Sequence, residues 1–187
     1  MTELMYGTMA DAQLRGLLQA AMEHAAHGLS DMTGRAITID APRVEKLPIN
    51  QVVTHAGSPE MEIVGIYLLA SGDFAGQVIL MLPLAEALYL VDLLLGVPPG
   101  TTTELGDLER SALAEAGNLT TSYFLNEIAA RTTVSSRPSP PAVLVDMLGA
   151  VMDVVTTPVA SFTDVLMIAE TIFQDTGRAI AAYFWVL

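Results

Sequence analysis

The chain has 187 residues, of which 52% are hydrophobic, no cysteine, and a formal net charge of −13 from 21 acidic and 8 basic side chains. This length is sufficient for one domain with a substantial core. The lack of cysteine excludes disulfides and thiolate metal sites, and the negative charge argues against binding nucleic acid or an anionic membrane by general attraction. The longest apolar runs, such as Ile63–Ala70, are far shorter than the ~20 residues that span a bilayer. The first residues lack the basic region of a signal peptide, so we expect a soluble cytoplasmic protein.

The first half of the chain predicts a long helix, strands and a second helix. Spacing of leucines and alanines, turn residues and β-branched runs define these elements. In chain order they are helix Asp11–Thr33, strand Ala36–Ala41, connector Lys46–Thr54 with about one helical turn after Pro48, hairpin strands Glu60–Ala70 and Phe74–Leu82, and helix Pro83–Leu95. The segment Val97–Thr103 (VPPGTTT) is the clearest linker.

After the linker the order restarts with a long amphipathic helix. The expected elements are helix Asp107–Ala130, a β-rich connector through Val134, a rigid loop at Ser135–Pro141, a continuation at Val143–Val145, a short helix at Asp146–Val155, strand Asp164–Phe173, a turn at Gln174–Gly177 and strand Arg178–Val186. The repeated order predicts an internal duplication, although any two amphipathic helices can be aligned.

In our alignment the repeats are residues 11–96 and 104–187. The long helices align at an offset of 92 positions, with Glu23 over Glu115 and Pro48 over Pro140, and the hairpins align at 101. Two such α-β-β units predict an α+β fold with one mostly antiparallel sheet, covered on one face by the two long helices.

One side of the second long helix is polar in an unusual way. Ser111, Glu115, Asn118 and Ser122 fall within an arc of roughly 60° at about 100° per residue. A solvated helix face needs polar residues, which is the simple explanation. However, Asn118 and its neighbour Gly117 are both weak helix formers, so a packing or functional reason is expected for them.

These residues resemble the motif of the CheC family of response-regulator phosphatases, which includes CheC, CheX and the phosphatase part of FliY. The family motif is Asp or Ser, three residues, Glu, two residues, Asn, twenty-two residues, Pro. Ser111, Glu115, Asn118 and Pro141 fit every spacing. In the 92-position alignment the first copy is degenerate: Gln19, Glu23 and Ala26 occupy it, with Ile49 in place of the proline. The resemblance therefore implies one working site.

The resemblance implies hydrolysis of the aspartyl phosphate of a CheY-type response regulator in chemotaxis or motility signalling. Such a transfer needs mainly placement of a water and charge stabilisation. By resemblance, Asn118 would orient the attacking water, since a carboxamide can both donate and accept. Glu115 would pair with a lysine of the regulator, Ser111 would extend that contact, and Pro141 would fix the adjoining loop. No cofactor of its own is implied, because the regulator supplies Mg²⁺.

A second interpretation is a non-catalytic binding module. Domains similar to CheC also occur in the flagellar switch, and CheC proteins bind the deamidase CheD, in part through the short helix expected at Asp146–Val155. His24 and His27 on the first helix have the wrong spacing for a typical metal pair, so no metal site is expected. Two repeats can complete a sheet within one chain, which favours a monomer, although an edge strand could still pair.

Overall fold

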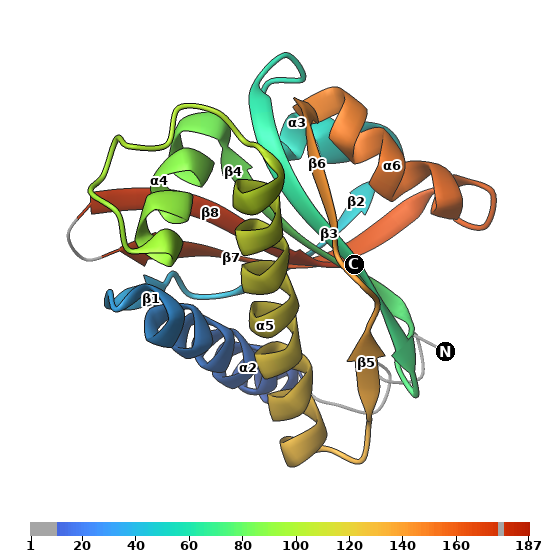
Figure 1. The fold of residues 1–187 in the computed structure, drawn as a ribbon. Coiled ribbons are helices and arrows are strands. Elements are labelled where there is room, and N and C mark those ends of the chain that lie inside the picture. The colour runs from blue at the N-terminus through green and yellow to red at the C-terminus, as the bar shows by residue number, and fades with distance from the viewer. Residues whose placement is uncertain (1–10, 176–177) are drawn as a thin grey trace.

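The computed structural model describes residues 11–175 and 178–187 (Figure 1). The described part contains helices and strands whose order nearly repeats. They are α2 (Asp11–Thr33), β1 (Ile37–Ile39), β2 (Arg43–Pro48), a 3-10 turn η1 (Ile49–Gln51), α3 (Val52–Ala56), β3 (Glu62–Gly72), β4 (Gly76–Pro83), α4 (Leu84–Leu95), α5 (Asp107–Arg131), β5 (Ser136–Pro138), β6 (Ala142–Met147), α6 (Leu148–Ala160), β7 (Val165–Asp175) and β8 (Arg178–Val186).

All the strands join one sheet, and every described pairing is antiparallel. The order is β1-β7-β8-β4-β3-β5, with β2 also on β7 and β6 also on β3. The β3–β4 and β7–β8 hairpins meet in the middle, where Ile79 lies opposite Trp185. The predicted α+β class with an antiparallel sheet is therefore confirmed.

Helices cover both faces of this sheet (Figure 1). The long helices α2 and α5, together with α4, pack over one aliphatic core, as predicted for the long pair. The shorter α3 and α6 pack over a second core on the opposite face, around Trp185. Where α2 and α5 meet, Gly28 lies so close to Tyr123 that a Cβ would come within 2.6 Å of its ring. The two long helices are thus in close contact with each other.

Several predicted boundaries were wrong. The predicted connector Lys46–Thr54 begins inside strand β2 (Arg43–Pro48), which was missed because a charged edge strand shows little apolar alternation. No strand precedes residue 135 in the second half; instead β5 lies within the proline-rich segment, paired with the end of β3. Helix α6 begins at Leu148 rather than Asp146. The end of the predicted turn Gln174–Gly177 lies outside the described residues, and its start belongs to β7.

Matching hydrogen bonds show how the two halves correspond. After α2, the hydroxyl of Thr33 donates to the carbonyl of Leu29 at 2.8 Å and accepts from the Arg35 amide. After α5, Thr132 donates to Ile128 at 2.7 Å and accepts from the Val134 amide in the same way. The helices therefore correspond at an offset of 99 positions, from Thr33 to Thr132.

The strands agree with this correspondence. Arg43 pairs with Glu170 on one side of the sheet, and Ala142 pairs with Tyr67 on the other. Those pairs give an offset of 99 for β2 and β6, and of 103 for β3 and β7. Under the same offset of 99 positions His24 corresponds to Tyr123, and these two rings contact each other edge to face with centroids 5.0 Å apart. A pseudo-twofold axis thus passes between the long helices.

The offsets of 92 and 101 are therefore wrong. The helical error is seven residues, which is close to two turns of helix at 3.6 residues per turn, so the same apolar pattern appears in both alignments. The hairpin comparison relied in part on Gly177, which lies outside the described residues.

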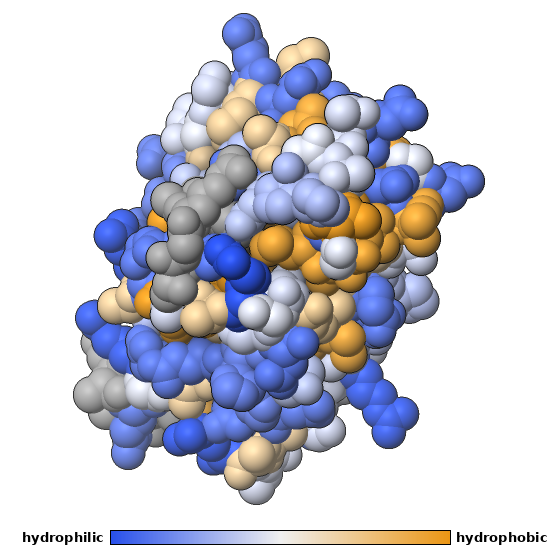
Figure 2. All heavy atoms as spheres, turned by 60° about the vertical axis from the view of Figure 1, so that its left-hand side comes forward, coloured by the Kyte–Doolittle hydropathy of each residue, from blue (hydrophilic) through white to orange (hydrophobic). Residues whose placement is uncertain are grey.

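The surface that carries α4 is mostly hydrophilic, with one larger hydrophobic area and several smaller ones (Figure 2). Within residues 11–175 and 178–187, no helix combines the length and hydropathy needed to cross a membrane.

Candidate functional site

Helix α5 presents the polar column on the side away from the core. Ser111 and Glu115 are exposed, while Asn118 and Ser122 are half-buried. The opposite side of the helix is buried and consists of Leu113, Ala116, Gly117, Thr120, Thr121, Phe124, Leu125 and Ile128. Asp107 and Glu109 lie in the first turn, where the helix dipole favours acidic side chains. The structure thus brings the hydroxyl, the carboxylate and the carboxamide to one accessible surface.

The three motif side chains of this column have no structural partner in the described part of the chain. Ser111, Glu115 and Asn118 make no hydrogen bond or ion pair there. Asparagine is a poor residue for the middle of a helix unless its amide is used. Because no internal contact explains Asn118, its amide is available to an external group.

Gly117 has a packing role. A Cβ at this position would overlap the side chain of Ile66 on β3, so only glycine lets the backbone of α5 rest this closely on the sheet. One of the two weak helix formers is thus explained by packing. The close contact also fixes the height of Asn118 above the sheet.

Pro141 precedes β6, a strand that α5 contacts (Figure 1). The loop before it is held by Ser139, whose amide donates to the Leu69 carbonyl at 2.7 Å and whose hydroxyl accepts from the Leu69 amide at 3.0 Å. Pro141 is half-buried at the end of this anchored loop. Its position fits the expected role of fixing the loop beside α5.

The corrected offset changes the first-half copy of the motif. Gly16 now occupies the position of Glu115, Gln19 that of Asn118, and Pro42 that of Pro141. Ala26, which we had aligned with Asn118, is only 3% exposed and belongs to the core. Pro42 was the signal in the sequence that could have shown the correct alignment.

Gln19 and Glu23 do lie near the surface of α2, but they engage each other. The Gln19 amide donates to the Glu23 carboxylate at 2.6 Å. The first half therefore has a carboxamide at the position of Asn118, but that carboxamide is held by a neighbour. It has no carboxylate at position 16.

The histidines serve contacts within the protein. His24 lies 2.8 Å from the carboxylate of Glu127, and Arg131 also bonds to that carboxylate. Hydrogen bonds from Arg131 and His24 hold the pKa of Glu127 below its ordinary value. His55 lies 3.1 Å from Glu170. Among the residues that the structure describes, no group of three His, Asp or Glu side chains could hold a metal ion.

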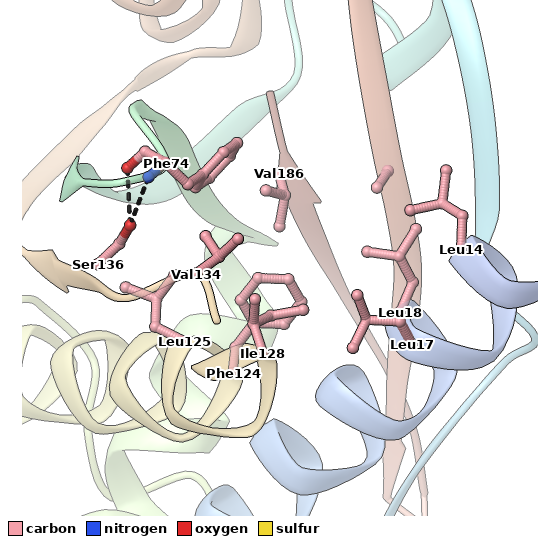
Figure 3. Close-up of a pocket in the computed structure, with 11 residues that line it drawn as sticks. Leu14, Leu17, Leu18, Phe74, Phe124, Leu125, Ile128, Val134, Ser136 and Val186 are labelled. Atoms are coloured by element: carbon pink, nitrogen blue, oxygen red, sulfur yellow. Dashed lines mark hydrogen bonds between the residues drawn. The ribbon is translucent and has the colours of Figure 1, made fainter. Parts of the chain in front are cut away.

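A cavity of about 30 Å³ lies beneath α2 and α5 (Figure 3). Its walls are nearly all aliphatic or aromatic, including Leu17, Phe124 and Val186, and its one polar side chain, Ser136, is bonded to the backbone of Phe74. None of the polar column lines it. The lining of this cavity is therefore almost wholly apolar.

Comparison with known proteins gives related sequences and folds. The chain is 29% identical over 131 residues to the CheY-P phosphatase CheC of Bacillus subtilis (strain 168), a match that covers 69% of this chain and 63% of that relative. The matched part thus spans less than two thirds of the relative's length. No family model matches the chain.

Among solved structures, FliY of Thermotoga maritima aligns with a TM-score of 0.77 at 19% identity, over 96% of this chain and 91% of that one. A chain of the CheX-CheY-BeF3-Mg²⁺ complex of Borrelia burgdorferi aligns with a TM-score of 0.59 at 16% identity, over 91% and 96%. The FliM middle domain of H. pylori aligns at 0.67 and 12% identity, over 95% and 92%. These structural likenesses show a shared fold.

Proposed function

We propose that the chain is a CheC-like protein that hydrolyses the aspartyl phosphate of a CheY-type response regulator in chemotaxis signalling, as its 29% identity to a CheC protein suggests. The observation that carries the proposal is the pair Glu115 and Asn118. Both side chains lie on the accessible side of α5 without a partner in the described residues, on a helix fixed to the sheet at Gly117.

In this proposal Asn118 acts on water. An acyl phosphate is already activated, so the reaction needs a water held in line and stabilisation of charge rather than covalent catalysis. The carboxamide of Asn118 accepts a hydrogen bond from the water with its oxygen and donates with its nitrogen, without a tuned pKa. The Mg²⁺ is a part of the phosphorylated regulator, which is the substrate.

Glu115 and Ser111 position the substrate. They lie one and two turns before Asn118 on the same side of α5, so a regulator that meets Asn118 also covers them. Glu115 pairs with a lysine of the regulator and Ser111 extends that contact. Pro141 supports the loop beside the helix. A group that binds substrate and transition state equally changes KM, whereas one that acts on the water changes kcat.

The test is loss of phosphate from a purified CheY-type regulator, phosphorylated by a small-molecule donor. We expect the wild type to accelerate the loss. Asn118→Ala should lower kcat on the order of 10²-fold or more, and Glu115→Ala should mainly raise KM. Neither change should affect folding, because both side chains lack internal bonds. Near-wild-type turnover by Asn118→Ala would refute the assignment.

A second candidate function is favoured by a separate observation. Exposed apolar side chains lie along α6 and at its two ends: Met147, Val154 at 44% exposure, and Phe162 at 87%. These support docking of a protein partner there, for which the deamidase CheD is the candidate given by the family resemblance.

Binding of CheD and of the regulator, measured with wild type and Val154→Asp, separates the two roles. If the chain binds CheD but never accelerates phosphate loss, the binding module is the correct function.

We further propose that the chain is a monomer, since its sheet is completed within one chain.

A further inference from the structure

Helix α5 carries its free polar side chains on the flank that faces β6. Gly117 points at the sheet, and at about 100° per residue Asn118 lies roughly a quarter turn from it on one side. Tyr123 and Glu127, which contact α2, lie roughly a quarter turn from it on the other side. The α2 side of the helix is thus covered, and the side with Asn118 faces β5 and β6 (Figure 1).

Two exposed apolar residues of β6 lie beside this flank. Val143 packs against the core beneath the long helices, and Leu144 packs against the second core. Because side chains alternate along a strand, Val145 and Met147 lie on the same face of the sheet as Val143. They are 36% and 52% exposed. The sheet face that carries them is therefore the face that α5 covers.

A third exposed apolar side chain lies on α5 itself. Leu108 is in the first turn of α5, is 63% exposed and lies two turns before Glu115. It is half a turn from Gly117, so it points away from the sheet. The first turns of α5 and the end of β6 lie at the same end of the sheet (Figure 1). We call Leu108, Val145 and Met147 the apolar rim, because they border the polar column from both sides.

Single exposed apolar residues are common on soluble proteins. The apolar rim differs because it surrounds polar side chains that have no partner among the described residues. Asn118 is half-buried between the exposed side of α5 and β6. A protein that reaches Asn118 from solvent therefore covers the rim as well. Apolar contacts around a polar centre stabilise a complex and exclude water from it.

We propose that the apolar rim binds an apolar patch that the CheY-type regulator carries beside its phosphorylated aspartate. This inference rests on the proposed function and deepens it. The rim contributes affinity for the regulator, whereas Asn118 acts on the water. Leu108 and Val145 are thus positioning residues, and their loss should change binding and not the chemical step.

The test measures binding and turnover by the full chain. Binding is titrated with a purified CheY-type regulator activated by beryllofluoride and Mg²⁺, and turnover is measured with the phosphorylated regulator. Leu108→Gln and Val145→Gln should each weaken binding by at least about fivefold and raise KM by a similar factor, with kcat unchanged. Leu108→Met, which keeps an apolar side chain, should bind like the wild type.

Leu69→Gln is the matched control. Leu69 is 48% exposed on β3, but its neighbours Leu68 and Ala70 pack beneath the long helices, so its side chain lies on the opposite face of the sheet. This variant should keep the wild-type Kd and KM. Because the substituted side chains are exposed, all variants should unfold at the wild-type temperature.

Salt separates the rim from the charged contact. The loss of affinity in Leu108→Gln should persist at high salt, because an apolar contact is not screened. The loss in Glu115→Gln should become smaller, because salt screens the pair of its carboxylate with a lysine of the regulator.

The proposal is overturned if the wild type does not bind the activated regulator, or if both rim variants bind like Leu69→Gln. It is also overturned if they lower kcat while KM stays unchanged. The proposed phosphatase fails separately. A wild type that binds the activated regulator but releases no phosphate would refute the phosphatase, and the values of Kd would still decide whether the rim binds.

Discussion

Helices α2 and α5 are the same scaffold carrying different surfaces. Leu14, Leu17, Leu18 and Ala25 are buried in α2, and the residues 99 positions later are buried in α5. Their exposed sides differ. Helix α5 presents Glu115 and Asn118 without internal partners, whereas α2 presents Gly16 and a glutamine that bonds to Glu23.

The difference between the exposed side chains of α2 and α5 shows that the fold does not depend on the polar residues of the proposed site. Both helices end in the same threonine-capped turn and both are followed by a strand of the same sheet. Proline also occupies the equivalent loop position in both halves, at 42 and 141. Shared features therefore belong to the scaffold, and features of α5 alone are the best candidates for function.

The largest expected effect comes from giving position 118 of α5 the glutamine that α2 has at the equivalent position 19. Asn118→Gln keeps the carboxamide but moves it outward by one methylene. We expect turnover of the phosphorylated regulator to fall on the order of 10²-fold, because a displacement of about 1 Å in a positioning group has that effect. Phosphate release at saturating regulator measures it.

The matched control for this test is Gln19→Asn, which makes the reverse change in α2 and should leave turnover unchanged. Retention of full activity by Asn118→Gln would mean that the position of the amide does not limit the rate.

Two glycines give opposite expectations for stability. Gly117→Ala should destabilise the protein by about 1–3 kcal/mol, because the new methyl group overlaps Ile66. Gly16→Ala should instead stabilise it by up to about 1 kcal/mol, since nothing lies near that position and alanine is the better helix former. Urea unfolding of both variants measures the free energies. A stabilised Gly117→Ala variant would contradict the close packing of α5 on β3.

Helix α4 follows the first hairpin. Its buried Asp92 accepts hydrogen bonds from the amides of Gly100 and Thr102, at 2.6 and 2.8 Å, and so anchors the linker between the halves. Burial acts to raise the pKa of Asp92, but the bonds from Thr102, Gly100 and Thr101 outweigh it and hold the pKa below its ordinary value.

Asp92→Asn should therefore destabilise the protein by about 1 kcal/mol near neutral pH. A lowered folded pKa gives stability that is present above the unfolded value of about 3.9 and is lost as the pH falls through the folded value. The gap between wild type and Asp92→Asn should accordingly close in acid. Urea unfolding of wild type and Asp92→Asn, at neutral pH and at a pH below the unfolded pKa of about 3.9, measures the difference in the free energy of unfolding. A difference that is the same at both pH values would show that the charge of Asp92 is unimportant.

The smallest expected effect is a gain in the first half. Gly16→Glu with Gln19→Asn, in the Asn118→Ala background, should restore a low rate of phosphate release, because Pro42 already occupies the position of Pro141 and only the Ser111 position, at Ala12, stays unmatched. Ala26→Asn in the same background should restore none, since Ala26 lies in the core. A rise with Ala26→Asn, and none with the double variant, would favour the offset of 92.

The sequence predicted the long helices well because their apolar residues recur at helical spacing, so the end of the first helix at Thr33 was correct. The polar column was also found, because it is local to one helix. The alignment of the halves was missed because a shift of seven residues preserves the apolar pattern, and only Pro42 distinguishes the two alignments. Strand β2 was missed because pairing with β7, which is distant in sequence, determines it.

The position of β8 in the sheet has a consequence for how the protein is made. It follows every other strand along the chain, yet it lies in the middle of the sheet between β7 and β4. A ribosome therefore releases β3 and β4 long before the strand that β4 needs as its inner neighbour. Such distant pairing slows folding and leaves strand edges exposed during synthesis. The central β4–β8 pairing of the sheet can therefore form only after β8 has been translated.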